Sequence, residues 1–139
     1  MADTTKISNA AATAEANAFA DQLNSGYLRI YDSTGGTGQP ATVDTAVGSQ
    51  KLLAELRFAA TSETSITDGV ITFAAITADS SANDTGTATW FRALASNGST
   101  AIWDGSVSTT GATLNLNTTS IVTGAAVSVT SLTFTCNKG

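Results

Sequence analysis

Alternation of apolar and polar side chains is the main pattern along this chain. In residues 51–58 every second side chain is apolar: Leu52, Ala54, Leu56 and Phe58. Residues 27–31 and 112–117 alternate in the same way, while residues 70–76 are apolar at nearly every position. A period of two returns side chains to the same face of a β-strand, and a continuous apolar run is typical of a central strand. The chain is therefore predicted to be mainly β.

Turn signals separate short apolar runs at intervals of about ten residues through 85–135, as in two packed sheets of about seven or eight strands. Residues 26–139 are predicted to form a single antiparallel β-sandwich domain, of jelly-roll or immunoglobulin-like type.

The strongest turn signal is Asn97-Gly98, because a type I′ turn needs positive φ at both central residues. A two-residue turn there would set Arg92 opposite Trp103, where the two side chains could form a cation–π pair. Both faces of this hairpin are largely apolar. One face can line the core, so the other needs a second cover, which we expect to be a subunit interface or the N-terminal helix.

Residues 1–25 are predicted to be an N-terminal arm that carries one short helix. Ser8 or Asn9 can cap a helix over 9–24, and Asn24-Ser25-Gly26 is a stop signal. One helical face carries the apolar side chains Ala12, Ala16, Phe19 and Leu23. So short a helix is marginal alone and must dock, either on its own domain or on a neighbouring subunit.

The charge balance excludes some partners. The net charge is −5 at a pI of about 4.3, and the six basic residues are scattered, so neither nucleic acid nor an anionic membrane surface is an expected partner. No apolar run approaches the ~20 residues needed to span a bilayer. The N-terminal residues lack a charged leader and an apolar segment, so no secretory signal is predicted and synthesis in the cytoplasm is expected.

The sequence contains only weak matches to catalytic or metal-binding motifs. Asp84-Thr85-Gly86 matches the aspartic-protease signature, but it follows polar residues, which favours a plain turn. Residues 79–84 offer oxygen ligands without the glycine and distal glutamate of a calcium loop. The chain has no histidine, and Cys136 fits a half-buried residue at a strand end better than a reactive or intermolecular thiol. We expect no enzymatic activity, no catalytic residues, no cofactor and no bound metal.

Several strand-and-turn segments resemble a family of small virion proteins of tailed bacteriophages and prophages. They are LRIYD (28–32), LLAELRF (52–58), GTATWFRALASNG (86–98), DGSV (104–107) and LNLNTTSIVTGAAVSVTSLTF (114–134). The similarity spans roughly residues 26–135. It implies a structural protein of the virion, often encoded close to capsid genes.

From this resemblance we expect a capsid decoration (cement) protein on the outer head surface, where it contacts the major capsid protein and stabilises the shell. Proteins of this kind often assemble as homotrimers that bridge neighbouring capsomers. The residues expected to contact the shell are Ile7, Phe19, Leu23 and Tyr27, and those expected at the trimer interface are Trp90, Leu94 and Trp103.

Two other hypotheses stay open. The first is a tail, neck or baseplate component of the virion. The second is a carbohydrate-binding or adhesin module, in which Trp90 and Trp103 would form a flat stacking platform for sugars.

Overall fold

The computed structural model describes residues 4–33 and 37–139. Its first element is the helix α1 (Asn9–Gln22), close to the predicted range. Ser8 caps the helix, because its Oγ accepts a hydrogen bond from the Ala11 N–H at 3.0 Å. The buried face of α1 carries the small side chains of Ala12, Ala16 and Ala20, which let the helix lie close to the sheet.

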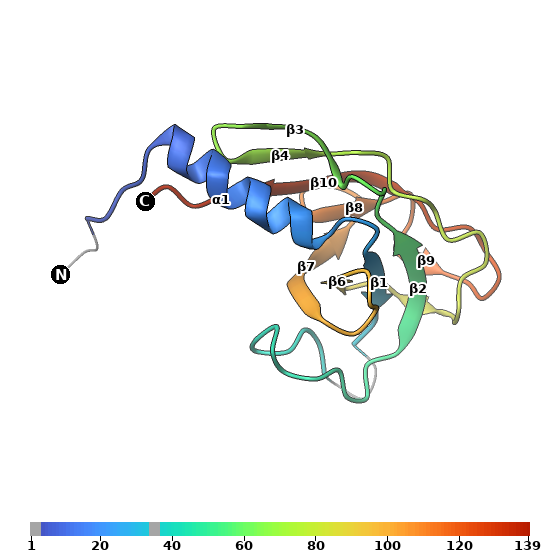
Figure 1. Cartoon of the computed structure of the whole chain (residues 1–139). Helices are drawn as coiled ribbons and strands as arrows, with labels where there is room; N and C mark the ends of the chain where they lie inside the picture. The colour runs from blue at the N-terminus through green and yellow to red at the C-terminus, as the bar shows by residue number, and fades with distance from the viewer. Residues whose placement is uncertain (1–3, 34–36) are drawn as a thin grey trace.

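Ten strands follow α1 within the described residues, and eight of them form one sheet in the order β2-β1-β6-β7-β8-β10-β4-β3 (Figure 1). The strands of this sheet are β1 (Tyr27–Tyr31), β2 (Leu52–Arg57), β3 (Glu63–Thr67), β4 (Val70–Phe73), β6 (Trp90–Leu94), β7 (Ala101–Ser108), β8 (Leu114–Leu116) and β10 (Val129–Thr135). Two short strands, β5 (Gly86–Thr87) and β9 (Ser120–Ile121), pair separately.

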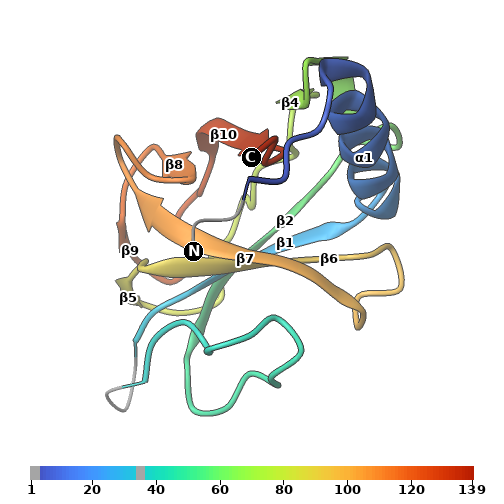
Figure 2. The same cartoon turned by 90° about the vertical axis from the view of Figure 1, so that its left-hand side faces the viewer.

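The mainly β fold is confirmed, but the predicted purely antiparallel sandwich is not what the structure shows. The eight-stranded sheet is mixed, because β7 and β8 pair in parallel through Val107–Leu114 and Ser108–Asn115. At this seam the sheet curls, so that β8, β10 and β4 lie over the layer formed by β2, β1, β6 and β7 (Figure 2). Alternation fixes which side chains share a face, and it carries no information on the direction of the neighbouring strand.

The interior contains two apolar clusters. The larger lies between the two layers of the curled sheet and includes Leu28, Phe91 and Leu114. The smaller lies between α1 and the strands β3, β4 and β10, where the helix alanines meet Ile71 and Cys136. The sequence left two docking sites open for the helix, its own domain or a neighbouring subunit. The structure shows that α1 packs on its own domain.

The β6–β7 hairpin does not have the predicted turn. Of the two central residues, only Gly98 has a positive φ, 72°. The loop spans residues 96–99 and is closed by a hydrogen bond from the Ala95 N–H to the Thr100 carbonyl at 2.9 Å. A bulge then makes Ile102 the extra residue, because Leu94 pairs with Ala101 and Ala93 pairs with Trp103. The predicted pairing of Arg92 with Trp103 is therefore wrong by one position.

Candidate interaction surfaces

The residues predicted for a trimer interface lie in the interior of the single chain. Trp90 is 1% exposed and Leu94 is 4% exposed, so neither has surface left for a second subunit. Trp103 is half-buried in an aromatic cluster with Phe19, Phe73, Phe91 and Phe134. This placement corrects the predicted interface. It also removes the sugar-stacking platform, which needs flat and exposed aromatic faces.

The second cover of the hairpin comes from the chain itself. The segment 38–50 lies against the face of β1 and β6 opposite to α1 (Figure 2). It is tied there by a hydrogen bond from Arg92 Nη1 to the Thr45 carbonyl at 2.8 Å. Under this segment Trp90 stacks on Tyr31 with ring centroids 4.6 Å apart. Neither the N-terminal helix nor a subunit interface is needed to explain the apolar second face.

Arg92 forms a buried ion pair that the predicted register did not anticipate. Its guanidinium donates two hydrogen bonds to the Asp104 carboxylate, at 2.7 and 2.8 Å, and both side chains are at most 5% exposed. The hydrogen bonding and charge of Asp104 raise the pKa of Arg92 even though burial alone would lower it. The aromatic ring near Arg92 is that of Trp90, at 5.7 Å, and not that of Trp103.

The same face of the sheet carries a row of four charges across four strands. Glu55, Arg29, Arg92 and Asp104 occupy paired positions on β2, β1, β6 and β7. Arg29 therefore lies directly opposite Arg92, a like-charge pair that would destabilise the sheet by itself. Each arginine instead binds its own carboxylate, Arg29 through a 2.7 Å hydrogen bond to Glu55. Burial is the largest single influence and lowers the pKa of Arg29, but the hydrogen bond and the charge of Glu55, together with Tyr31, raise it by more, so the net pKa is raised.

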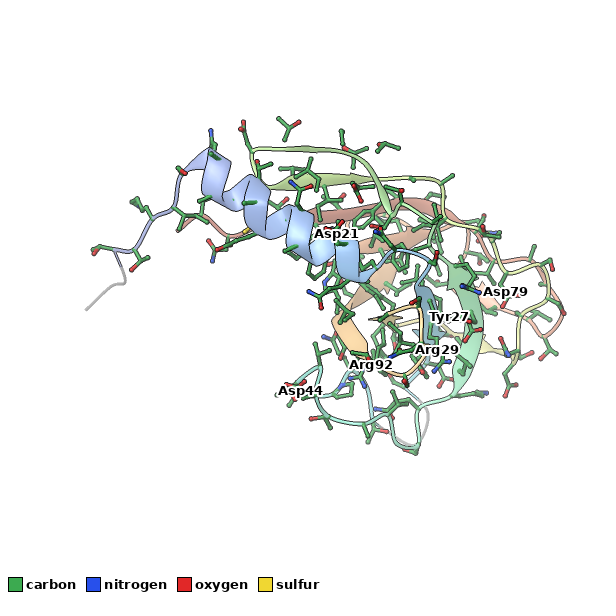
Figure 3. The ribbon with its side chains drawn as sticks, in the orientation of Figure 1. Asp21, Tyr27, Arg29, Asp44, Asp79 and Arg92 are labelled. Atoms are coloured by element: carbon green, nitrogen blue, oxygen red, sulfur yellow. The ribbon has the colours of Figure 1, made fainter. Side chains whose placement is uncertain are left out.

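The residues predicted to contact the shell are separated in the structure. Leu23 is fully buried in the main core, which excludes it as a contact residue. Phe19 is half-buried and stacks on Phe134 with centroids 4.0 Å apart. Ile7 is half-buried, and its N–H donates to the carbonyl of Lys138 at 3.0 Å. Tyr27 lies on the opposite side of the sheet from α1, close to Arg29 (Figure 3).

We name Tyr27, Arg29 and Arg57 the arginine–tyrosine surface. The Arg57 guanidinium lies over the Tyr27 ring, 4.0 Å from its centroid, and Arg29 approaches the same ring to 5.9 Å. The three side chains share a face because Tyr27 pairs with Arg57 and Arg29 with Glu55 across β1 and β2. The sequence suggested Tyr27, but its arginine neighbours follow only from the register of these two strands.

A second surface is the outer side of β3, β4 and β10, which we name the hydroxyl face. Cross-strand pairs place six exposed and uncharged residues there in two rows: Thr67, Val70 and Thr135, and Ser65, Thr72 and Thr133. Strand β3 is at the end of the sheet, and within the described residues no further strand pairs with it. Its outer edge therefore presents unpaired backbone N–H and C=O groups.

Sequence reasoning did not predict β3. The signal was present, because Asp68-Gly69 is a strong two-residue hairpin signal. The structure has this type of turn, since Asp68 and Gly69 have φ of 53° and 83° and Thr67 pairs with Val70. The strand itself has a single apolar side chain, Ile66, so alternation alone was too weak to reveal it.

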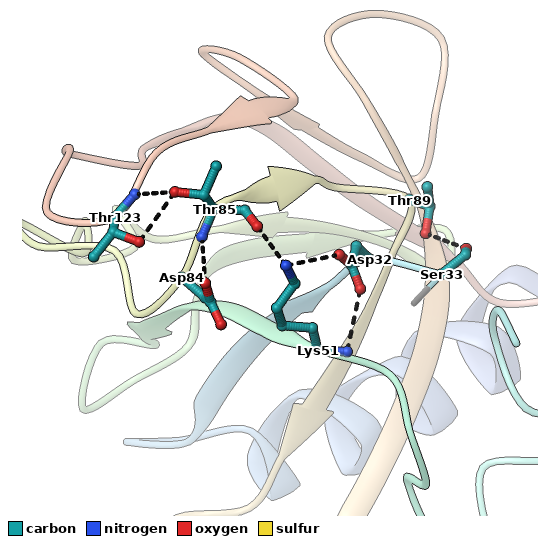
Figure 4. A network of polar contacts seen from close by, with 7 residues as sticks. All are labelled: Asp32, Ser33, Lys51, Asp84, Thr85, Thr89 and Thr123. Atoms are coloured by element: carbon teal, nitrogen blue, oxygen red, sulfur yellow. Dashed lines mark hydrogen bonds and ion pairs between the residues drawn. The ribbon is translucent and has the colours of Figure 1, made fainter. Parts of the chain in front are cut away.

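The Asp84-Thr85-Gly86 motif belongs to a polar network that ties three loops together (Figure 4). The chain bends at Asn83 and Asp84, and the Asp84 carboxylate accepts a hydrogen bond from the adjacent Thr85 N–H at 2.8 Å. Lys51 links this bend to the end of β1, because its ammonium group donates to the Thr85 carbonyl at 2.6 Å and lies 3.8 Å from the Asp32 carboxylate. The Thr85 and Thr123 hydroxyls join the network to the turn after β9.

Cys136 directly follows β10, as expected of a strand-end residue, but it is buried and not half-buried. Its thiol donates a hydrogen bond to the Glu15 carboxylate at 2.9 Å. This bond, together with desolvation and the charge of Glu15, raises the pKa of the thiol. A raised pKa keeps the thiol protonated and poorly nucleophilic at neutral pH.

Among the described residues, no helix combines the length and apolar character required to cross a bilayer. No protein-family model, curated protein or solved structure matches this chain.

Proposed function

We propose that this chain is a structural protein of a bacteriophage virion, bound as a decoration protein to the outer surface of the head. The observation that carries the proposal is the hydroxyl face beside the unpaired edge of β3. The resemblance of residues 26–135 to small virion proteins supports the same role. The major capsid protein is the proposed partner.

The physical character of the hydroxyl face suits a rigid and repeating partner. Five of its six residues are threonine or valine, whose β-branched side chains are restricted at χ1. Such side chains lose little conformational entropy when a partner covers them. The adjoining edge of β3 can add backbone hydrogen bonds to an extended segment of that partner. Weak contacts of this kind, repeated over a shell, give high overall avidity when the copies are linked in an oligomer.

A homotrimer is part of the proposal, with contacts that do not involve Trp90 or Leu94. Light scattering on the purified protein measures the assembly directly. A mass three times that of the chain supports the trimer, and a monomer at high concentration would remove it from the proposal.

Co-sedimentation with undecorated heads of the phage or prophage that encodes the chain tests the function. We expect the wild-type protein to sediment with the heads, and Thr72→Lys, at the centre of the hydroxyl face, to weaken binding at least tenfold. Thr87→Lys is the matched control, because it makes the same change at an exposed position on β5. Thermal unfolding of both variants checks that the fold is kept.

Two results would contradict the proposal. One is a wild-type protein that does not sediment with the heads at any concentration. The other is antibody labelling of intact particles confined to the tail, which would assign the chain to the tail, neck or baseplate.

A further inference from the structure

Arg57 is an oriented cation without an acidic partner. Arg57 is exposed, its guanidinium carbon lies over the Tyr27 ring, and its Nη2 donates to the Ser25 carbonyl at 2.8 Å. Among the described residues Arg57 takes part in no ion pair, whereas Arg29, Lys51 and Arg92 each have a carboxylate. The chain has eleven acidic residues and six basic ones, so acidic side chains are not in short supply.

The support under Arg57 is rigid. The Tyr27 ring lies beside the β6–β7 turn, where a Cβ at Gly98 would be 3.3 Å from the ring. This turn is fixed by Asn97, whose side-chain carbonyl accepts hydrogen bonds from the Ser99 and Thr100 N–H groups, each at 2.9 Å. A guanidinium held on such a platform has already lost much of its rotamer freedom, so binding costs it less entropy.

The acidic groups nearby are engaged elsewhere. Glu55 binds Arg29, and Asp79 accepts hydrogen bonds from the backbone N–H groups of Glu55 and Ser81. Arg57 is exposed. Its guanidinium makes one hydrogen bond within the chain, to the Ser25 carbonyl. A guanidinium has five N–H donors in a planar fork that matches a carboxylate.

We propose that Arg57, oriented by Tyr27, binds a carboxylate side chain of a protein partner. Arginine and tyrosine are the residue types that most often dominate the binding energy of protein interfaces. A carboxylate fits better than a nucleic-acid backbone, because a chain with a net charge of −5 repels an extended polyanion. The inference relies on the proposed function to name the capsid as the partner, but its chemistry does not depend on that identification.

NMR titration of the ¹⁵N-labelled protein tests the chemistry without any phage component. The probe is acetylated tetraglutamate, compared with sodium chloride and with inorganic phosphate at matched ionic strength. We expect saturable shifts of the Arg57 Nε–H and the Tyr27 amide with tetraglutamate alone. Arg57→Gln should weaken binding at least tenfold, and Arg57→Lys severalfold, because an ammonium group cannot form the bidentate contact. Lys6→Gln is the matched control and should change nothing.

Shifts equal to those in sodium chloride, or unchanged in Arg57→Gln, would overturn the proposal. Equal binding of inorganic phosphate would overturn the assignment to carboxylates. The same variants are then mixed with undecorated heads. Wild-type protein that fails to bind heads contradicts the proposed function alone, whereas Arg57→Gln that binds heads as tightly as wild type contradicts Arg57 as the capsid contact.

Discussion

The extra residue at Ile102 decides which side chain faces Arg92. Without the bulge Arg92 would lie opposite Trp103. With it, Arg92 lies opposite Asp104 and makes a bidentate ion pair beneath the segment 38–50. A buried ion pair can contribute little net stability over an apolar pair, yet removing one partner leaves an uncompensated charge in the interior.

Arg92→Met should therefore lower the free energy of unfolding by about 3–5 kcal/mol, because Asp104 would remain buried without its partner. Arg29→Met is the control. The Arg29–Glu55 pair lies in the same row, but its side chains are about one-third exposed, so the loss should be ~1 kcal/mol or less. Urea unfolding of the two variants measures the difference, and equal losses would show that burial does not set the cost.

At the scale of the elements, two Xaa-Gly turns behave differently. Asp68-Gly69 forms the two-residue hairpin turn, whereas Asn97-Gly98 lies inside a longer loop. Gly69 also faces the helix, because a Cβ at this position would lie 2.9 Å from the Ala12 Cβ and 3.2 Å from the Cys136 Cβ. The tight β3–β4 turn therefore also sets how closely α1 approaches the sheet.

Gly69→Ala tests this double role against Gly111→Ala. Both glycines have positive φ, 83° and 75°, but a Cβ at Gly111 would meet no atom within 4 Å. Gly111→Ala should cost about 1–2 kcal/mol of backbone strain, and Gly69→Ala should cost clearly more because the helix must shift as well. Chemical unfolding compares the two. If both variants lose the same free energy of unfolding, the contact of Gly69 with α1 does not add to the cost of the substitution.

At the scale of the whole molecule, two groups link stability to alkaline pH. Burial raises the pKa of Tyr31, despite the opposing charge of Arg29, and the bond to Glu15 raises the pKa of Cys136. Below about pH 7.5 both groups are protonated in the folded and the unfolded chain, so neither affects the free energy of unfolding. Above that pH the unfolded chain releases these protons first, which favours unfolding.

The free energy of unfolding should accordingly be nearly constant close to pH 7 and fall as the pH rises from about 8 to about 11, first through Cys136 and then through Tyr31. Tyr31→Phe keeps the stack on Trp90 and removes one titrating group, so its decline should be shallower. Urea unfolding at pH 8 and pH 10.5 gives the two slopes. Identical slopes for wild type and Tyr31→Phe would exclude Tyr31 as a source of the alkaline sensitivity.

The sequence determined the features that depend on near neighbours. Alternation located β1, β2 and β8, and the cap at Ser8 with the stop signal from Asn24 located α1. Of the residues selected as contacts from the sequence, Tyr27 keeps part of its surface exposed, whereas Leu23, Trp90 and Leu94 are buried. The sequence shows that a side chain is apolar, but it does not show whether another subunit or the same chain buries it.

The tertiary structure decided everything that depends on residues far apart in the chain. The parallel contact between β7 and β8 and the bulge at Ile102 join segments that are close in sequence, but their direction and register depend on the packing of the sheet. The cover formed by residues 38–50 brings distant segments together. The pairing of Tyr27 with Arg57 across β1 and β2 belongs to the same class. Local propensities cannot encode such contacts, because strand register and direction are fixed by the packing of the whole sheet.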